Sequence, residues 1–453
     1  MEALANWVTL NHRRVLSWFK DDVFRRLFIN AGKLLSANVI AAVLGLIATV
    51  LTARALGPES YGILALVLVY QLTIGKLVTF NAWEAVIKFG SEALHADEQP
   101  ALRQLIKFGF TLDIASAIVG TALAMMLAGP VVHLLGWDVS VRSLLVLYSV
   151  VILFSLSGTP IGILRLFDRF DLLSYTAIVS SIVRLMGIVW CLLTRQALFG
   201  FVLAYLVTTV IGQLYLVFAS LWVLKTQNIT RIIAQPWHGI RARFPGIVDY
   251  VWTTNVNSTI RTLSREGDEF VVAGLTTPAT LGLFKLAKQF SRILPTLLDP
   301  LYHSIYPEFT RFAAAGNKCA FVALLKRATL LVSVLAAGGW LSFLLLGRWF
   351  VALTAGTDYS QTYVVAAVYM LALIILLGGF ALAPAMLSLG FPRRSLGAVC
   401  AATAAYFMAL VPLISWWGIT GAAIAYVIFA LIWLLVMLLF LHSGLRRSTN
   451  CSQ

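Results

Sequence analysis

The chain has 453 residues, of which 60% are apolar and only 12% are charged. Because an ordinary soluble domain carries roughly 25% charged residues, this composition excludes a soluble globular protein. No block of like charges occurs, which excludes a disordered chain and nucleic-acid binding by a basic arm. The composition predicts an all-α polytopic membrane protein, since a helical span needs roughly 20 mostly apolar residues.

Residues 1–28 predict an amphipathic helix that lies on the cytoplasmic membrane surface. Charged residues interrupt this segment repeatedly, so it does not have the pattern of a cleavable signal peptide. Leu16, Phe19, Val23 and Leu27 recur at helical spacing, as expected of a helix with one apolar face. A disordered tail is the alternative interpretation.

Apolar stretches occupy most of the remaining chain, and each predicts a membrane-spanning helix because a spanning backbone must satisfy its own hydrogen bonds. The twelve stretches are, in chain order, 30–54, 61–83, 106–128, 143–164, 172–194, 198–224, 247–274, 279–304, 324–346, 361–388, 396–416 and 419–441. A basic loop near the middle divides them into two sets of six. The predicted units are the N-terminal segment 1–28, a first lobe at 29–225, the inter-lobe loop 226–245, a second lobe at 246–442 and a tail at 443–453.

The positions of Lys and Arg predict that both chain ends lie in the cytoplasm. With that orientation, most cations outside the spans fall in cytoplasmic segments, in agreement with the positive-inside rule. The external segments contain few, namely Arg54, Arg142, Arg195 and Arg348.

The two halves share a short repeated pattern. Pro58 and Gly62 in the first half have counterparts in Pro278 and Gly282 at a constant offset, within the pattern A-x4-P-x3-G. In each half a proline turn follows the first helix and a glycine lies in the second. This repeat predicts two six-helix lobes related by a pseudo-two-fold axis along the membrane normal, with a site at their interface.

Charged residues within two adjacent spans predict a functional site, since charge inside a membrane is costly. The span 247–274 contains Arg261, Arg265, Glu266, Asp268 and Glu269, and the span 279–304 contains Lys285, Lys288, Arg292 and Asp299. For the first of these spans, pairing between charges and lining of a water-filled cavity remain open. The excess of cations in the second favours cavity lining. A basic cavity suits an anionic substrate such as a phosphate or pyrophosphate.

The first half contributes isolated charges, which are the cations Lys76 and Arg184 and the carboxylate Asp113. Each is as consistent with an interfacial or paired position as with substrate contact. The sequence has no P-loop, no hydrolase motif and no Cys/His spacing typical of a metal site. It therefore predicts neither an ATPase nor another enzyme, and no metal centre.

The segment LTARALGPESYG, residues 51–62, resembles the oligosaccharide flippases of the polysaccharide-transport branch of the multidrug/oligosaccharidyl-lipid/polysaccharide exporter superfamily. These proteins carry a small-Arg-x-Leu-Gly-Pro-x-x-Tyr-Gly turn after the first helix. The stretches 268–282 and 300–307 match further. The turn motif comprises Arg54, Gly57, Pro58 and Gly62, with Pro278 and Gly282 in the second half.

The resemblance implies that polyprenyl-pyrophosphate-linked oligosaccharide repeat units cross the bacterial inner membrane by alternating access, for O-antigen, lipopolysaccharide or exopolysaccharide synthesis. It implies coupling to H⁺ or Na⁺ without a cofactor, and it implies membrane lipids and the pathway's polymerase and export machinery as partners. The candidate substrate-binding cations are Lys76, Arg184, Arg261, Arg265, Lys285, Lys288 and Arg292. The candidate coupling carboxylates are Asp113, Glu266, Asp268, Glu269 and Asp299.

Two other functions remain as alternatives. A drug/cation antiporter of the same superfamily would prefer acidic and aromatic walls, which the excess of cations opposes. A polytopic glycosyltransferase or polymerase of the pathway would need a sizeable external catalytic loop, and the external loops of this chain are short.

Overall fold

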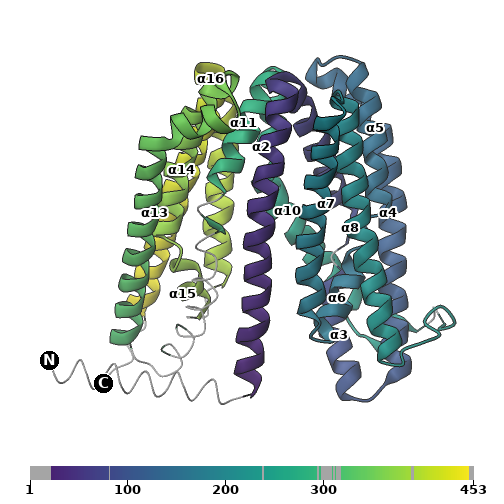
Figure 1. Ribbon diagram of the computed structural model, residues 1–453. Helices are drawn as coiled ribbons and strands as arrows, with labels where there is room; N and C mark the ends of the chain where they lie inside the picture. The colour runs from purple at the N-terminus through teal and green to yellow at the C-terminus, as the bar shows by residue number, and fades with distance from the viewer. Residues whose placement is uncertain are drawn as a thin grey trace.

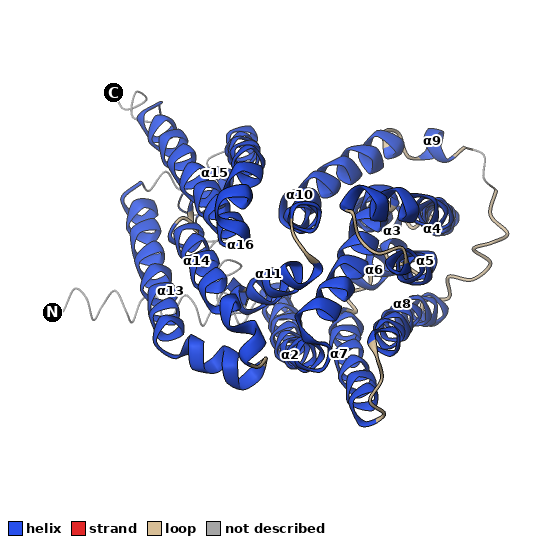
Figure 2. Ribbon diagram, turned by 90° about the horizontal axis from the view of Figure 1, so that it is seen from above, coloured by secondary structure: helices blue, strands red, loops and turns tan. Residues whose placement is uncertain are grey.

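The computed structural model describes residues 22–80, 82–236, 239–292, 295–296, 309, 312, 318–388 and 392–447. Within these ranges every regular element is a helix (Figure 2). Eight of the described helical stretches are long and apolar enough to cross a membrane. The prediction of an all-helical membrane protein is therefore confirmed.

The helices of the first half gather on one side of the molecule and most of those of the second half gather on the other (Figures 1 and 2). The first half comprises α2 (Asp22–Val78), α3 (Ala82–His95), α4 (Gln99–Leu135), α5 (Ser140–Leu153), α6 (Gly158–Leu166), α7 (Phe170–Leu193) and α8 (Leu198–Thr226). The short α9 (Ile240–Arg243) follows. The second half comprises α10 (Ile247–Leu275), α11 (Pro278–Ser291), α13 (Lys318–Thr354), the 3₁₀ turn η1 (Thr357–Tyr359), α14 (Ser360–Gly378), α15 (Leu382–Ser388) and α16 (Pro392–Arg447).

Two of the eight apolar stretches each contain two of the spans expected from the sequence. Helix α2 is interrupted at Gly57 (φ 70°, ψ 170°), and α16 is interrupted at Gly418 (φ 59°, ψ −142°). Both glycines adopt a left-handed φ, which a residue with a Cβ atom rarely does. At the first kink Pro58 follows Gly57 and supplies a residue suited to the start of a helix. The boundary between the first two expected spans and the boundary between the last two are therefore kinks and not loops.

Other expected spans are divided or only partly described. The stretch 143–164 is broken at residues 154–157 into α5 and α6, and α2 and α3 are separated after Val78. Residues 22–28 were expected in a surface helix, but they form the start of α2. Residues 1–21 lie outside the described part. Helices α10 and α11 are not among the eight apolar stretches.

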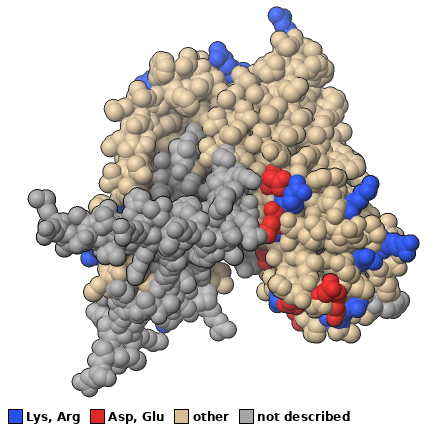
Figure 3. Space-filling model, turned by 60° about the horizontal axis from the view of Figure 1, so that its bottom comes forward, with Lys and Arg blue, Asp and Glu red and all other residues tan. Residues whose placement is uncertain are grey.

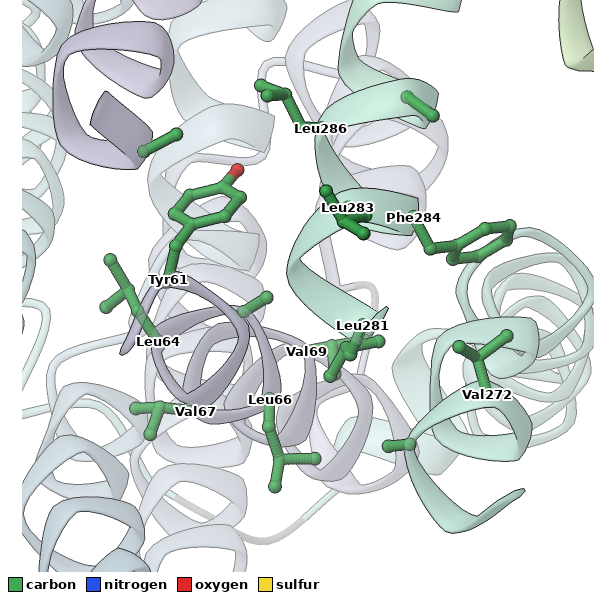
Figure 4. Packing of buried hydrophobic residues seen from close by; sticks show 14 of the residues in the cluster. Tyr61, Leu64, Leu66, Val67, Val69, Val272, Leu281, Leu283, Phe284 and Leu286 are labelled. Carbon is green, nitrogen blue, oxygen red and sulfur yellow. The ribbon is translucent and has the colours of Figure 1, made fainter. Parts of the chain in front are cut away.

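A shared apolar core holds α2 against the second half. Side chains from the part of α2 that follows Gly57 lie beside those of α11 (Figure 4), and α14 and α16 extend the same buried cluster. The labelled residues are Tyr61, Leu64, Leu66, Val67 and Val69 of α2, Val272 of α10, and Leu281, Leu283, Phe284 and Leu286 of α11. Because helix association in a membrane relies on close packing, this core fixes the position of α11 and of its charges.

The outer surface is that of a protein surrounded by lipid. Large apolar side chains are widely exposed, among them Met126, Leu134, Leu193 and Leu345, each with at least 75% of its surface accessible. Exposed apolar area on this scale marks a membrane-facing surface. On the face shown in Figure 3, most of the described surface is uncharged, and Lys, Arg, Asp and Glu occur in small groups.

Candidate functional site

The turn between α10 and α11 places the charges of the two helices side by side. Helix α10 ends at Leu275, and α11 starts two residues later with Thr277 as its N-cap and Pro278 at the first helical position. The Thr277 hydroxyl accepts a hydrogen bond from the Thr280 backbone N–H at 3.4 Å. This proline-led start reverses the chain within a few residues. The lower part of α11 therefore runs back along α10.

Two lysines of α11 and the arginine that caps its end pair with three carboxylates of α10. Lys285 Nζ lies 2.7 Å from Glu269 Oε2. Lys288 Nζ lies 2.8 Å from Asp268 Oδ1 and 3.1 Å from Glu269 Oε1. Arg292 Nη2 lies 2.6 Å from Glu266 Oε1. We refer to these six residues, Glu266, Asp268, Glu269, Lys285, Lys288 and Arg292, as the paired-charge cluster.

The interior of the paired-charge cluster is closed, and its edge is open. Asp268, Glu269 and Lys288 are at most 2% exposed. An unpaired charge at such depth would destabilise the protein by about 3–5 kcal/mol, which explains why both signs are present together. The Arg292 side chain, by contrast, is 47% exposed. The sequence favoured cavity lining for the span that contains Lys288 and Arg292. Lys288 is instead buried and paired, whereas Arg292 is both paired and accessible.

A tyrosine that the sequence analysis did not single out completes the cluster. The Tyr406 hydroxyl of α16 donates a 3.0 Å hydrogen bond to Asp268 Oδ2, which links a third helix to the α10–α11 pair. Tyr406 packs edge-on against Tyr426, which stacks on Tyr369 with a centroid separation of 4.3 Å. A buried tyrosine hydroxyl needs a polar partner, and that rule was the available signal for Tyr406 in an apolar span.

A cleft of about 220 Å³ opens between α2 and the end of α11. Its α2 wall is entirely apolar, and its other wall carries the Arg292 guanidinium. The lining residues are Val39, Ala42, Val43, Leu46, Gln289, Arg292 and Thr296. The cleft therefore juxtaposes one accessible cation with an aliphatic wall.

The remaining predicted site residues lie elsewhere or outside the described part. Arg184 of α7 stacks over the Tyr205 ring of α8 at 5.4 Å, within the first half. Lys76 ends α2, and its backbone carbonyl accepts a hydrogen bond from Thr259 of α10. Asp113 is buried in α4 against α6. The side chains of Arg261 and Arg265, and the whole of Asp299, lie outside the described residues.

The repeated turn motifs pack directly against each other. A Cβ atom at Gly62 would lie 1.7 Å from the Pro278 carbonyl oxygen, and one at Gly282 would lie 2.3 Å from the Pro58 carbonyl oxygen. Both positions require glycine because the backbones touch. The four residues found by their spacing therefore form one reciprocal contact between α2 and α11.

Two hydrogen bonds cross between the halves beside this contact. Trp137 Nε1 donates to the Ala273 carbonyl at 3.1 Å, and the Tyr359 hydroxyl donates to the Ala53 carbonyl at 2.8 Å. Ala53 and Ala273 occupy equivalent positions in the repeat. The two donors lie in equivalent interhelical turns, each opened by a glycine with positive φ. Spacing alone did not identify Trp137 or Tyr359, because their partners are backbone carbonyls.

Arg54 strengthens the same junction. Its Nη1 donates to the Leu353 carbonyl in the last turn of α13 at 3.2 Å. Such carbonyls have no partner within their own helix, so an arginine is a suitable donor. We refer to the contacts made by Arg54, Gly62, Trp137, Gly282 and Tyr359 as the upper contact, because the turns from α4 to α5 and from α13 to α14 lie at the upper end of the molecule in Figure 1.

Comparison with known proteins establishes the family. The sequence profile of a family described as polysaccharide biosynthesis protein matches residues 27–313. The chain belongs to this family. It is also 29% identical to the inner membrane protein YghQ of Escherichia coli K12 over 355 residues, which cover 76% of this chain and 97% of that protein. The resemblance found at residues 51–62 is therefore confirmed.

Solved structures show the fold. An inward-facing multidrug resistance MATE transporter of the MOP superfamily superposes with a TM-score of 0.72 at 12% identity, covering 90% of this chain and 95% of that one. The lipid II flippase MurJ in an inward closed conformation superposes with a TM-score of 0.70 at 17% identity, covering 92% and 90%. A MOP superfamily transporter from Pyrococcus furiosus gives 0.63 at 11% identity, covering 93% and 95%. The chain thus has the fold of these three proteins.

Proposed function

We propose that this protein moves polyprenyl-pyrophosphate-linked oligosaccharide repeat units from the cytoplasmic to the outer face of the bacterial inner membrane. The cleft at Arg292 carries this proposal. A lipid-linked pyrophosphate presents an anionic group next to an aliphatic chain, and the cleft presents a guanidinium next to an aliphatic wall. A guanidinium can bind two phosphate oxygens at once, which favours this head group. The polymer served would be an O-antigen or another surface polysaccharide.

The architecture proposed for this function has twelve membrane helices in two lobes, 29–225 and 246–442. The kinks at Gly57 and Gly418 divide α2 and α16 into two spans each, which supports that number. The reciprocal packing of the two turn motifs supports a pseudo-two-fold axis along the membrane normal. The distribution of cations supports cytoplasmic chain ends. In this orientation the upper contact faces the outside.

Substrate binding would compete with an internal ion pair. Arg292 is held by Glu266 Oε1, and the pyrophosphate would replace this carboxylate on the guanidinium. Glu266 Oε2 has no hydrogen-bond partner in the described structure and lies 3.8 Å from Lys288 Nζ. A carboxylate released from Arg292 becomes a proton acceptor, so the exchange would link substrate binding to an ion gradient. Lys285 and Lys288 would continue to neutralise Asp268 and Glu269 throughout.

Alternating access would require the upper contact to open. In this structure it joins the two halves by backbone packing and by three hydrogen bonds, and in the proposed orientation it would act as a closed outer gate. Release of substrate to the outer face then requires these contacts to separate while the lobes close at the other end.

Deletion of the gene in its native host tests the proposal. Loss of the surface polymer together with accumulation of lipid-linked repeat units facing the cytoplasm is the expected result. Wild-type protein and Arg348→Ala should restore the polymer, whereas Arg292→Ala should not. Arg348 is a matched control because it is an exposed arginine of α13 outside the cluster. An unchanged polymer with increased drug sensitivity would favour the drug/cation antiporter instead.

A further inference from the structure

A second buried polar site lies in the first half, away from the paired-charge cluster. Asp113 of α4 is fully buried, and its Oδ2 accepts the backbone N–H of Thr159 at 2.7 Å. Thr159 is the second residue of α6, a helix of nine residues that begins after the break at residues 154–157. The carboxylate therefore ties α4 to the start of an interrupted helix.

Two polar atoms of this site lack a hydrogen-bond partner among the described residues. Asp113 Oδ1 and Thr159 Oγ1 are both buried, and neither has a hydrogen-bond partner in the described part of the chain. A buried carboxylate that remains charged normally has a cation or several donors around it. Asp113 has one backbone N–H, from Thr159, and the hydroxyl of the same residue beside it. A proton on Oδ1 would remove the charge and convert that oxygen into a donor.

The packing around Asp113 leaves room for little more than a proton. A Cβ atom at Gly158 would lie 2.6 Å from Asp113 Oδ1 and 3.3 Å from the Phe80 carbonyl oxygen. A Cβ atom at Gly109 would lie 2.5 Å from Thr159 Oγ1. These glycines allow the backbones of three segments to meet around the carboxylate. A metal ion with its usual shell of oxygen ligands would need more space.

Charged residues on the elements packed against α4 are engaged elsewhere or do not reach Asp113. Arg165 stacks over Trp83, Lys88 lies over Phe89 and Tyr250, and Lys107 donates to carbonyls of the loop after α8. Arg243 pairs with Glu98. Among described side chains, no ion pair joins Asp113 to any other charged or titratable group of these elements, namely Arg54, Glu59, Lys76, Glu84, Glu92, His95, Arg142, Arg241, Asp249, Glu266, Asp268 and Glu269.

We propose that Asp113 is a proton-binding site that controls the attachment of α6 to α4. In the ionised state the Thr159 N–H donates to a charged oxygen, and such hydrogen bonds are about twice as strong as neutral ones. Proton binding replaces this bond with a weaker, neutral one and so loosens the attachment of the start of α6 to α4. The link from this proton to transport rests on the proposed function, whereas proton binding itself does not.

Infrared difference spectroscopy of the purified full-length protein, titrated with acid and base without substrate, tests the proposal. We expect a carbonyl band of a protonated carboxyl group that [4-¹³C]aspartate labelling displaces. The band should be lost in Asp113→Asn, which keeps an oxygen to accept the Thr159 N–H. It should persist in Asp97→Asn, since Asp97 is exposed in a turn with φ 53°, where asparagine is also tolerated.

Two results would overturn the proposal. One is the absence of any titrating band that responds to aspartate labelling in the wild-type protein, a measurement that needs no variant. The other is a band that persists unchanged in folded Asp113→Asn. If Asp113→Asn does not fold, the Thr159→Ala variant provides the test. Removal of the neighbouring hydroxyl must shift the frequency of the band that comes from Asp113, and an unshifted band would contradict the proposal. Since no substrate is present, these outcomes are independent of whether the protein is a flippase.

Discussion

The upper contact gives the sharpest mutational prediction. A Cβ atom at Gly62 would lie 1.7 Å from the Pro278 carbonyl oxygen, whereas real Cβ contacts essentially never fall below 3.0 Å. Gly62→Ala must therefore separate α2 and α11 by at least 1.3 Å along this direction (3.0 − 1.7 Å). The neighbouring 2.8 Å hydrogen bond from Tyr359 to Ala53 would lengthen as well.

Overpacking of this kind destabilises the closed contact by about 1–3 kcal/mol. If the open state does not suffer the same clash, the ratio of open to closed molecules should rise roughly 5- to 150-fold. Gly45→Ala is the matched control on the same helix, because a Cβ atom there meets nothing within 4 Å. Only the first substitution should change the ratio.

Pulsed electron–electron distance measurements can determine this ratio. Spin labels at Val139 and Leu353 suit the purpose, because both side chains are exposed, at 76% and 56%, and belong to different halves. The four native cysteines are first replaced. A longer-distance population should increase in Gly62→Ala and not in Gly45→Ala. Identical distance distributions in wild-type and folded Gly62→Ala protein would refute the assignment of this contact as a gate.

Four further substitutions test the paired-charge cluster. Tyr406→Phe leaves Asp268 Oδ2 without its donor and should cost about 1–3 kcal/mol of stability, seen as a lower thermal midpoint than in Tyr175→Phe, whose ring is exposed. Lys288→Met should cost about 3–5 kcal/mol, because the buried Asp268 loses its cation and Glu269 keeps only Lys285. Adding Asp268→Asn should recover part of this loss, and no recovery would contradict the pairing. Arg292→Lys should retain only part of the polymer restored by wild-type protein, since lysine cannot bind two phosphate oxygens in parallel.

Much of the fold could be predicted from hydropathy and from a few special residues. Apolar stretches of sufficient length identified the helices, and Pro58 and Pro278 marked equivalent turns in the two halves. The sequence could not show that the first turn is only a kink within α2, because a glycine and a proline are equally consistent with a loop. Nor did the sequence analysis predict the breaks after Val78 and Leu153, because single polar residues such as Thr79 and Ser155 also occur inside membrane spans.

The candidate site was predictable in its residues but not in its pairing. Charges within a span indicate a site, and helical spacing shows which of them share a face. Whether Lys288 meets a carboxylate or a cavity depends on how α10 and α11 are juxtaposed, and that is set by packing against α2. The contributions of Tyr406 and Trp137 depend on partners more than 130 positions away in the chain, a separation that no local pattern encodes.

Reconstituted translocation tests the central claim most directly. Purified protein in liposomes is given a fluorescent polyprenyl-pyrophosphate oligosaccharide, and the label on each face is measured with a membrane-impermeant quencher under an imposed ion gradient. Wild-type protein and Arg348→Ala should move the lipid faster than protein-free liposomes do, and Arg292→Ala should not. Wild-type translocation no faster than in protein-free liposomes, or equal rates for wild-type and Arg292→Ala, would contradict the account.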